Sequence, residues 1–108
     1  WYYPSMVNLY SSTFPGKPLC FTEIGYLTGE GYGDVPAGFS WASGNTLANQ
    51  VEWLSGAVQQ ARNSGIVRLF IIWNVDNTNW GADPQAGYAI VRPDGTCPAC
   101  NAIAQVMQ

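Results

Sequence analysis

Histidine is absent from this 108-residue chain. Without an imidazole, the sequence cannot supply a Ser-His-Asp or Cys-His nucleophile system, and zinc sites with histidine ligands are excluded. Any acid–base chemistry therefore falls to carboxylates, tyrosines or cysteines. We expect no cofactor.

Charge is also scarce, since only 10% of the residues are charged and the net charge is −3. The four basic residues form no cluster, so nucleic acid is not an expected partner, because phosphate contacts need Lys and Arg. A free-standing domain normally carries more surface charge. We therefore expect part of this surface to be covered by other protein.

Long apolar runs are missing as well: no stretch reaches the length of a membrane span, and no membrane partner is expected. The chain opens at Trp1 with no signal peptide, which is what we expect of a piece of a longer protein. Its 47% hydrophobic content can still bury a core, and residues 1–108 fit a single domain.

The apolar pattern predicts helix, strand, long loop, helix, strand, long loop, helix. Residues 4–14 have a weak helical pattern, and Leu19–Ile24 is a short apolar run that predicts a buried strand. The segment 25–44 holds six glycines and predicts a long loop. Loops of that length are usually functional.

The second half of the chain gives the clearest helix. Its apolar residues fall on one face, with Asn45 or Thr46 as the cap and Gly65 as the stop; they are Leu47, Val51, Leu54, Val58 and Ala61. The run 66–73 predicts a strand covered on both faces, with Arg68 as the exception. Residues 88–91 form a possible short extended piece, Asp94-Gly95 a turn and residues 97–107 a final helix.

Two parallel strands do not make a stable sheet, because three or more strands or heavy helix cover are needed. The predicted fold class is therefore α/β, as a fraction of a larger sheet. The missing strands would come from sequence beyond this chain or from other copies of it.

Three stretches resemble the last quarter of a clan A glycoside hydrolase, a cellulase-like (β/α)8 (TIM) barrel. The run 18–26, PLCFTEIGY, resembles the seventh strand, which ends in a nucleophilic glutamate, and FIIWN at 70–74 resembles the eighth, which ends in a tryptophan. Residues 87–98 resemble the loop that leads into the last helix. The resemblance implies a partial barrel with strands seven and eight, completed by the remainder of a barrel or by self-association into a homo-oligomer.

By this resemblance Glu23 is the nucleophile of a retaining hydrolase that acts on β-linked glycans. The alternative is a strand-end carboxylate that caps a helix or pairs with Arg68. The family's acid/base is a glutamate after an asparagine, and the sequence contains no Asn-Glu pair. Asp76 is the nearest local candidate for that role; the alternative is a residue that shapes its loop or contacts substrate. Glu52, off the apolar face of its helix, is expected to be solvated.

Aromatic side chains on strand ends and loops suit the apolar faces of sugar rings. We expect Trp73, Asn74, Tyr26 and Trp80 to bind the carbohydrate substrate. Tyr32 and Trp41 are further candidates, with a cluster that holds a loop down as the alternative, and Trp53 is expected to pack. Asn77 and Asn79 suit sugar hydroxyls or loop conformation equally.

Cys97 and Cys100 have the C-x-x-C spacing, for which the interpretation is a local disulfide in an enzyme from a secreted, extracellular parent protein. A thiol-disulfide redox function is the alternative. Cys20 is expected to be an inert, buried residue. Two further functions stay open beside the hydrolase: a non-catalytic carbohydrate-binding fragment, or a structural fragment, either of which lacks the acid/base.

Overall fold

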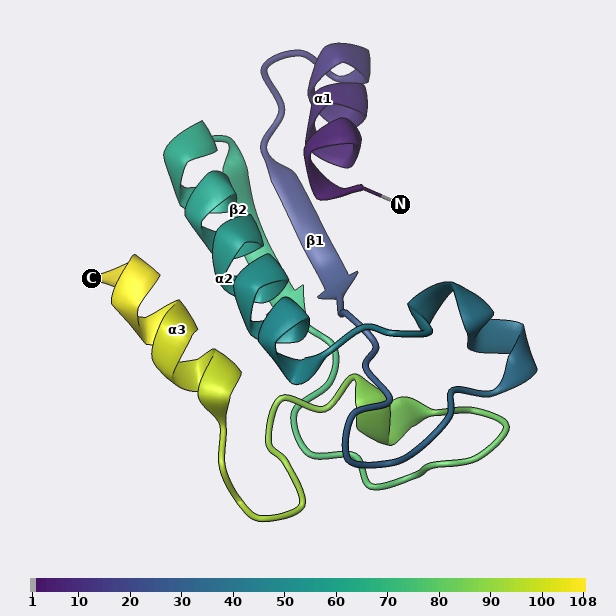
Figure 1. The fold of residues 1–108 in the computed structure, drawn as a ribbon. Helices are drawn as coiled ribbons and strands as arrows, with labels where there is room; N and C mark the ends of the chain where they lie inside the picture. The colour runs from purple at the N-terminus through teal and green to yellow at the C-terminus, as the bar shows by residue number, and fades with distance from the viewer. Residues whose placement is uncertain (1) are drawn as a thin grey trace.

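A computed structural model of the chain describes residues 2–108 (Figure 1). The elements, in order, are α1 (Tyr3–Thr13), β1 (Leu19–Ile24), η1 (Ala37–Ala42), α2 (Leu47–Ser64), β2 (Val67–Ile72), η2 (Gln85–Gly87) and α3 (Pro98–Met107). This is the predicted order, with the two 3₁₀ segments η1 and η2 added inside the long loops. Within residues 2–108, no helix is long and apolar enough to cross a bilayer.

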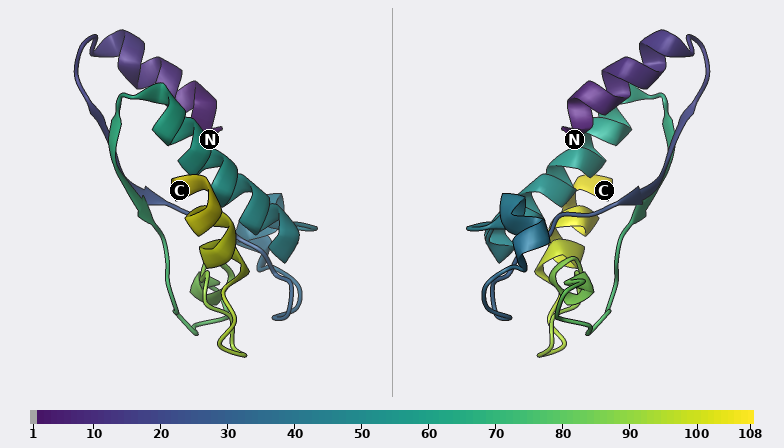
Figure 2. Two further views of the ribbon diagram at one scale, coloured as in Figure 1. Left: turned by 90° about the vertical axis from the view of Figure 1, so that its left-hand side faces the viewer. Right: turned by 90° about the vertical axis from the view of Figure 1, so that its right-hand side faces the viewer.

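β1 and β2 form one parallel pair, with Leu19 opposite Val67 and Phe21 opposite Phe70. α2 connects them, as expected for a parallel β-α-β unit. Figure 2 shows the three helices on one side of the two strands, with the other side uncovered by the described part of the chain. The α/β class is thus confirmed, and both loops that follow the strands gather at the carboxyl end of the sheet (Figure 1).

The core lies between the sheet and the helices, in two clusters. In one, Tyr3 of α1 and Ala57 of α2 are buried against Phe21 and Phe70, whose rings lie 4.9 and 5.9 Å from that of Tyr3. In the other, the buried residues are Leu54, Ile90 and Ala99. The predicted apolar face of α2 therefore does face the core.

Both predicted ends of α2 are confirmed. Thr46 is the N-cap, and its hydroxyl accepts a hydrogen bond from the Asn49 N–H, while the Asn49 side chain accepts one from the Thr46 N–H. Gly65 ends the helix with a φ of 67°. That left-handed conformation favours glycine, because a Cβ atom there would be strained.

The prediction that the second strand is covered on both faces is wrong. Leu69 is 43% exposed and Ile71 is 45% exposed, because the helices cover only the opposite face. Cys20 is exposed on β1, so the expectation of a buried cysteine is also wrong. The chain is accordingly flat, with a radius of gyration of 14.6 Å, compared with about 13 Å for a compact domain of this length.

Residues 88–91 do not form a strand. Single backbone hydrogen bonds tie Ile90 to Asn74 and Val91 to Val75, so this segment follows the loop after β2 without joining the sheet. The turn at Asp94-Gly95 is present, with Gly95 at a φ of 80°. It leads directly into α3, which packs beside α2 (Figure 1).

Candidate functional site

Glu23 lies next to an irregularity at the carboxyl end of β1. Phe21 pairs with Phe70 and Ile24 with Ile72, so two β1 residues, Thr22 and Glu23, stand opposite one residue of β2. A bulge of this kind interrupts the alternation of side chains and re-aims one of them. Phe21 and Ile24 both pack toward the helices as a result, while Thr22 and Glu23 are both exposed.

The structure supports neither of the two alternatives for Glu23, which are a helix cap and an ion pair with Arg68. Arg68 lies at the start of β2, near Leu19 and Cys20, at the other end of the sheet from Glu23. Glu30, not Glu23, caps a helix: its carboxylate accepts a 2.7 Å hydrogen bond from the Leu47 N–H at the start of α2. Among residues 2–108, no side chain donates a hydrogen bond to the Glu23 carboxylate, which leaves it free for chemistry.

Gly25 brings the two strand ends together. A Cβ atom at this position would lie 2.2 Å from the Trp73 carbonyl oxygen and 3.0 Å from the Tyr88 ring. The Trp73 N–H also donates to the Ile24 carbonyl at 2.7 Å, so the pairing continues past β2. Gly25 is therefore required for close approach, since its backbone is not in the left-handed region.

Two successive side-chain hydrogen bonds hold Trp73 at the end of β2. Its indole N–H donates to the Gln85 side-chain oxygen at 2.8 Å, and the Gln85 amide donates to Asp83 at 2.7 Å. Trp73 is nevertheless 41% exposed. An indole fixed at its N–H and open on its surface suits stacking against a flat apolar ligand face.

Asn74 is 9% exposed, and both ends of its amide have partners in the chain. Its Nδ2 donates to the Gln85 carbonyl at 2.9 Å, and its Oδ1 accepts from the Asn77 N–H at 3.2 Å. Asn79 likewise bonds to Asn77 and Asp83. These contacts give the asparagines a loop-shaping role, and their contact with sugar stays a prediction.

Gln50 of α2 links the two loops at the carboxyl end of the sheet. This residue of α2 is 1% exposed, and its amide donates to the carbonyls of Tyr26 at 2.8 Å, Gly87 at 3.1 Å and Tyr88 at 3.4 Å. Its Oε1 is buried with no hydrogen-bond partner within residues 2–108. Gln50 therefore fixes how Tyr26 and Tyr88 stand beside the strand ends.

Tyr88 lies beside Gly25, the second residue after Glu23, since a Cβ atom on Gly25 would lie 3.0 Å from the Tyr88 ring. Burial raises its pKa above the ordinary value of 10.0, and the nearby negative charges of Asp83 and Glu23 add to that increase. Tyr26, also half-buried, has its pKa raised mainly by burial. A neutral phenol beside a carboxylate can donate a hydrogen bond to it or to a bound hydroxyl.

Asp76, the sequence-based candidate for the second carboxylate, is exposed in the loop after β2. No interaction links it to Glu23 within the described residues; Asp83 is the acid whose charge acts on Tyr88 together with that of Glu23. Asp83 is in turn engaged by the Gln85 amide. The role of Asp76 as the second carboxylate stays a prediction.

Trp80 and Tyr32 pack on each other across the two loops. Their rings stack with centroids 4.9 Å apart, and the guanidinium of Arg92 lies 4.9 Å from the Tyr32 centroid. Arg92 is buried and donates to the Glu30 carbonyl at 2.7 Å. This stack holds the loops together, as in the packing alternative, while sugar binding by Trp80 stays a prediction.

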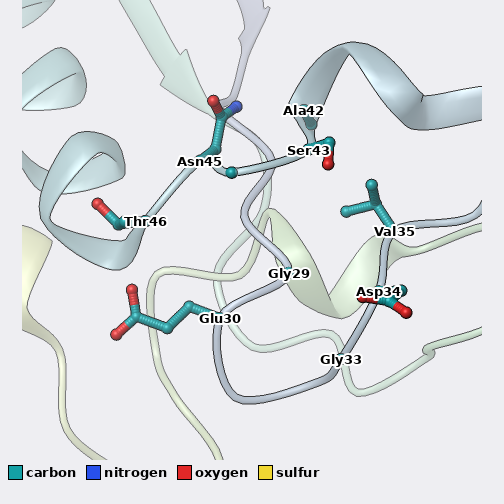
Figure 3. Close-up of a pocket in the computed structure, with 10 residues that line it drawn as sticks. Gly29, Glu30, Gly33, Asp34, Val35, Ala42, Ser43, Asn45 and Thr46 are labelled. Carbon is teal, nitrogen blue, oxygen red and sulfur yellow. The ribbon is translucent and has the colours of Figure 1, made fainter.

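A cavity of about 360 Å³ lies in the loop after β1. Figure 3 shows Glu30 directed toward the start of α2 and Asp34 on the other side. Because the Glu30 carboxylate is already used to cap α2, this cavity offers no free carboxylate pair. In residues 2–108, no group of three or more Cys, Asp or Glu side chains is placed to hold a metal ion.

Cys97 and Cys100 form a disulfide at the start of α3, with the sulfurs 2.03 Å apart. It closes a single turn of chain, and Cys97 packs against the Leu54, Ile90 and Ala99 cluster. Its position is that of a local staple for the last helix, and the redox alternative gains no partner group from the fold.

No protein-family model, curated protein or solved structure matches this chain. Three residues of the site were missed at the sequence level: Gln50, Gln85 and Tyr88. Two of them are amides: Gln50 donates to backbone carbonyls far away in the chain, and Gln85 bonds to the Trp73 and Asp83 side chains. Only the position of Tyr88, in the stretch 87–98, carried a signal that could have singled it out.

Proposed function

We propose that this chain is the C-terminal part of a (β/α)8-barrel retaining glycoside hydrolase acting on β-linked glycans, with Glu23 as its nucleophile. β1 and β2 take the places of the seventh and eighth strands. The observation that carries the proposal is an exposed, unbonded carboxylate at the carboxyl end of a parallel strand, with the exposed Trp73 at the end of the neighbouring strand. Active sites of barrels lie at this end of their strands.

The chemistry assigns one role to each group. In a retaining mechanism, the Glu23 carboxylate attacks the anomeric carbon to form a covalent glycosyl-enzyme, and a second carboxyl group about 5–5.5 Å away protonates the leaving oxygen. The same second group then takes a proton from the water that releases the sugar. Trp73 supports the sugar ring, and the Tyr88 hydroxyl is the candidate donor of a hydrogen bond to a sugar hydroxyl.

The second carboxylate is assigned to protein outside residues 2–108. The uncovered sheet face with Leu69 and Ile71, together with the free edges of β1 and β2, is where further strands would pack. They would come from the rest of a longer chain or from other copies of this one. A parent protein in an extracellular setting fits the disulfide.

The test is hydrolysis of a panel of aryl β-glycosides by the chain, by Glu23→Gln and by Asp34→Asn, with the molecular mass recorded by light scattering. Asp34 is the matched control, an exposed loop acid away from the strand ends. We expect turnover only in assemblies larger than the 11.7 kDa monomer, abolished by Glu23→Gln and retained in Asp34→Asn. Turnover that survives Glu23→Gln would refute the nucleophile.

A non-catalytic carbohydrate-binding fragment is the second candidate, favoured by the absence of the Asn-Glu acid/base motif from the sequence. It predicts a folded protein of any assembly state that binds glycans without turnover. In that case, Glu23 would occupy the position of the family's nucleophile without acting as one.

A further inference from the structure

An aromatic cleft of about 690 Å³ lies on the helix side of the sheet, where the start of α1, the loop after β1, η1 and one face of α2 meet. Figure 2 shows η1 and α1 on the same side of the strands as α2. This volume is in the range of small-molecule and cofactor sites.

Five aromatic side chains line this cleft, and three of them are exposed: Tyr2 at 72%, Trp41 at 63% and Trp53 at 37%. The fourth, Tyr26, packs its ring 5.5 Å from that of Trp53. Exposed tryptophans on one cavity are unusual on a surface with no ligand, because burying each ring in protein would be favourable.

Polar side chains also line the cleft. Glu52 and Gln60, both exposed on α2, line it, and neither side chain has a hydrogen-bond partner within residues 2–108. Tyr3, which also lines it, is 5% exposed, and its hydroxyl is buried without a partner. A buried hydroxyl without a partner is costly, and a ligand that supplies one would remove that cost.

The charge of the cleft and the arrangement of its rings restrict the classes of ligand that it can bind. No Lys or Arg lines the cleft, which argues against a phosphate, a nucleic acid or an acidic sugar. A purely apolar partner would bury the Glu52 carboxylate without compensation. A cage for a quaternary ammonium needs rings that surround one point, whereas Trp41 pairs with Phe39 at 6.3 Å, away from the Tyr26–Trp53 pair.

We infer that the aromatic cleft is a binding site for a neutral oligosaccharide, separate from the chemistry at Glu23. Apolar sugar faces stack on Trp41 and Trp53, while sugar hydroxyls donate to Glu52 and exchange hydrogen bonds with Gln60. The site anchors a glycan chain on the outer, helical side of the molecule and does not depend on Glu23.

The experiment is an NMR titration of the ¹⁵N-labelled chain with hexasaccharides of β-1,4-linked glucose or mannose, following the indole N–H signals. We expect the signals of Trp41 and Trp53 to shift in the wild type and equally in Glu23→Gln. Trp41→Ala and Glu52→Gln should each weaken binding, by about fivefold to tenfold for the lost stacking partner. Tyr10→Ala, an exposed aromatic of α1 outside the cleft, is the matched control and should leave binding unchanged.

Several results would overturn the inference. A shift of the Trp73 signal alone would place the sugar at the strand ends, which contradicts the cleft and leaves the hydrolase proposal standing. Shifts produced by choline chloride and by neither hexasaccharide would make the cleft a cation site. Shifts of Trp41 and Trp53 with protein concentration, without added sugar, would show that a second copy covers it.

Discussion

Replacing Gly25 with alanine should destabilise the chain strongly, because the new methyl group has no room. At 2.2 Å from the Trp73 carbonyl oxygen, a Cβ atom would overlap backbone rather than a movable side chain tip. Overpacking of this kind costs about 1–3 kcal/mol. Parting the strand ends would also lose the Trp73–Ile24 hydrogen bond, worth about 1 kcal/mol. The expected loss is therefore about 2–4 kcal/mol of unfolding free energy.

Gly56 provides the opposite case within the same chain. It lies inside α2, and a Cβ atom there would meet nothing within 4 Å. Alanine is favoured over glycine in a helix interior by about 1 kcal/mol, so Gly56→Ala should stabilise the protein.

Urea unfolding followed by circular dichroism measures both variants against the wild type. The predicted midpoints fall in the order Gly56→Ala, wild type, Gly25→Ala, with similar slopes if the unfolded states are alike. Where the wild type is itself less stable than about 3 kcal/mol, Gly25→Ala should be unfolded without urea. Equal midpoints for Gly25→Ala and the wild type would mean that the strand ends are not held this close.

Two further predictions concern the buried phenols and the disulfide. Burial raises the pKa of Tyr3, Tyr26 and Tyr88 above 10.0, so the stability they contribute is present below about pH 10 and is lost as the pH rises through their folded-state values. Unfolding at about pH 8 and pH 11 should show that loss, with a smaller decline in Tyr88→Phe; an identical decline would contradict the role of Tyr88. Replacing both Cys97 and Cys100 with serine should lower the free energy of unfolding by about 2 kcal/mol, since the loop that the disulfide closes is short. If the double variant instead loses a disulfide-exchange activity that the wild type has, that result would favour the redox alternative.

Segments whose signal is local were predictable from the sequence. Leu19–Ile24 has the predicted strand bounds, and Thr46 and Gly65 mark the ends of α2 as expected. A cap, a stop glycine and a short apolar run between turns depend on neighbours a few residues away, so one sequence is enough to find them.

The degree of cover on each sheet face was not predictable in the same way. A continuous apolar run favours a strand buried on both faces, but Leu69 and Ile71 are exposed because the described chain supplies helices for one face only. Cys20 shares that exposure. Periodicity records what a side chain is suited to contact, and it carries no information on whether the contact is within the same chain.

The positions of Glu23 and Trp73 at the strand ends were predictable, and the contacts around them were less so. The bulge that exposes Glu23 depends on the register between two strands, and the amide of Gln50 acts through carbonyls 24 to 38 residues away. Gly25 allows the close approach to Trp73, and its sequence position alone does not reveal that role. Such contacts form only when distant segments are already in place.

The pattern of charge and exposed apolar surface has a practical consequence for handling the molecule. The two open strand edges, beside exposed leucine and isoleucine side chains, are templates for pairing between molecules. Only the weak electrostatic repulsion from a net charge of −3 opposes that pairing. That repulsion vanishes near the isoelectric point of about 4.4. Precipitation is therefore expected on acidification and alkaline unfolding above about pH 10, which leaves neutral to mildly basic buffers at low protein concentration as the workable range.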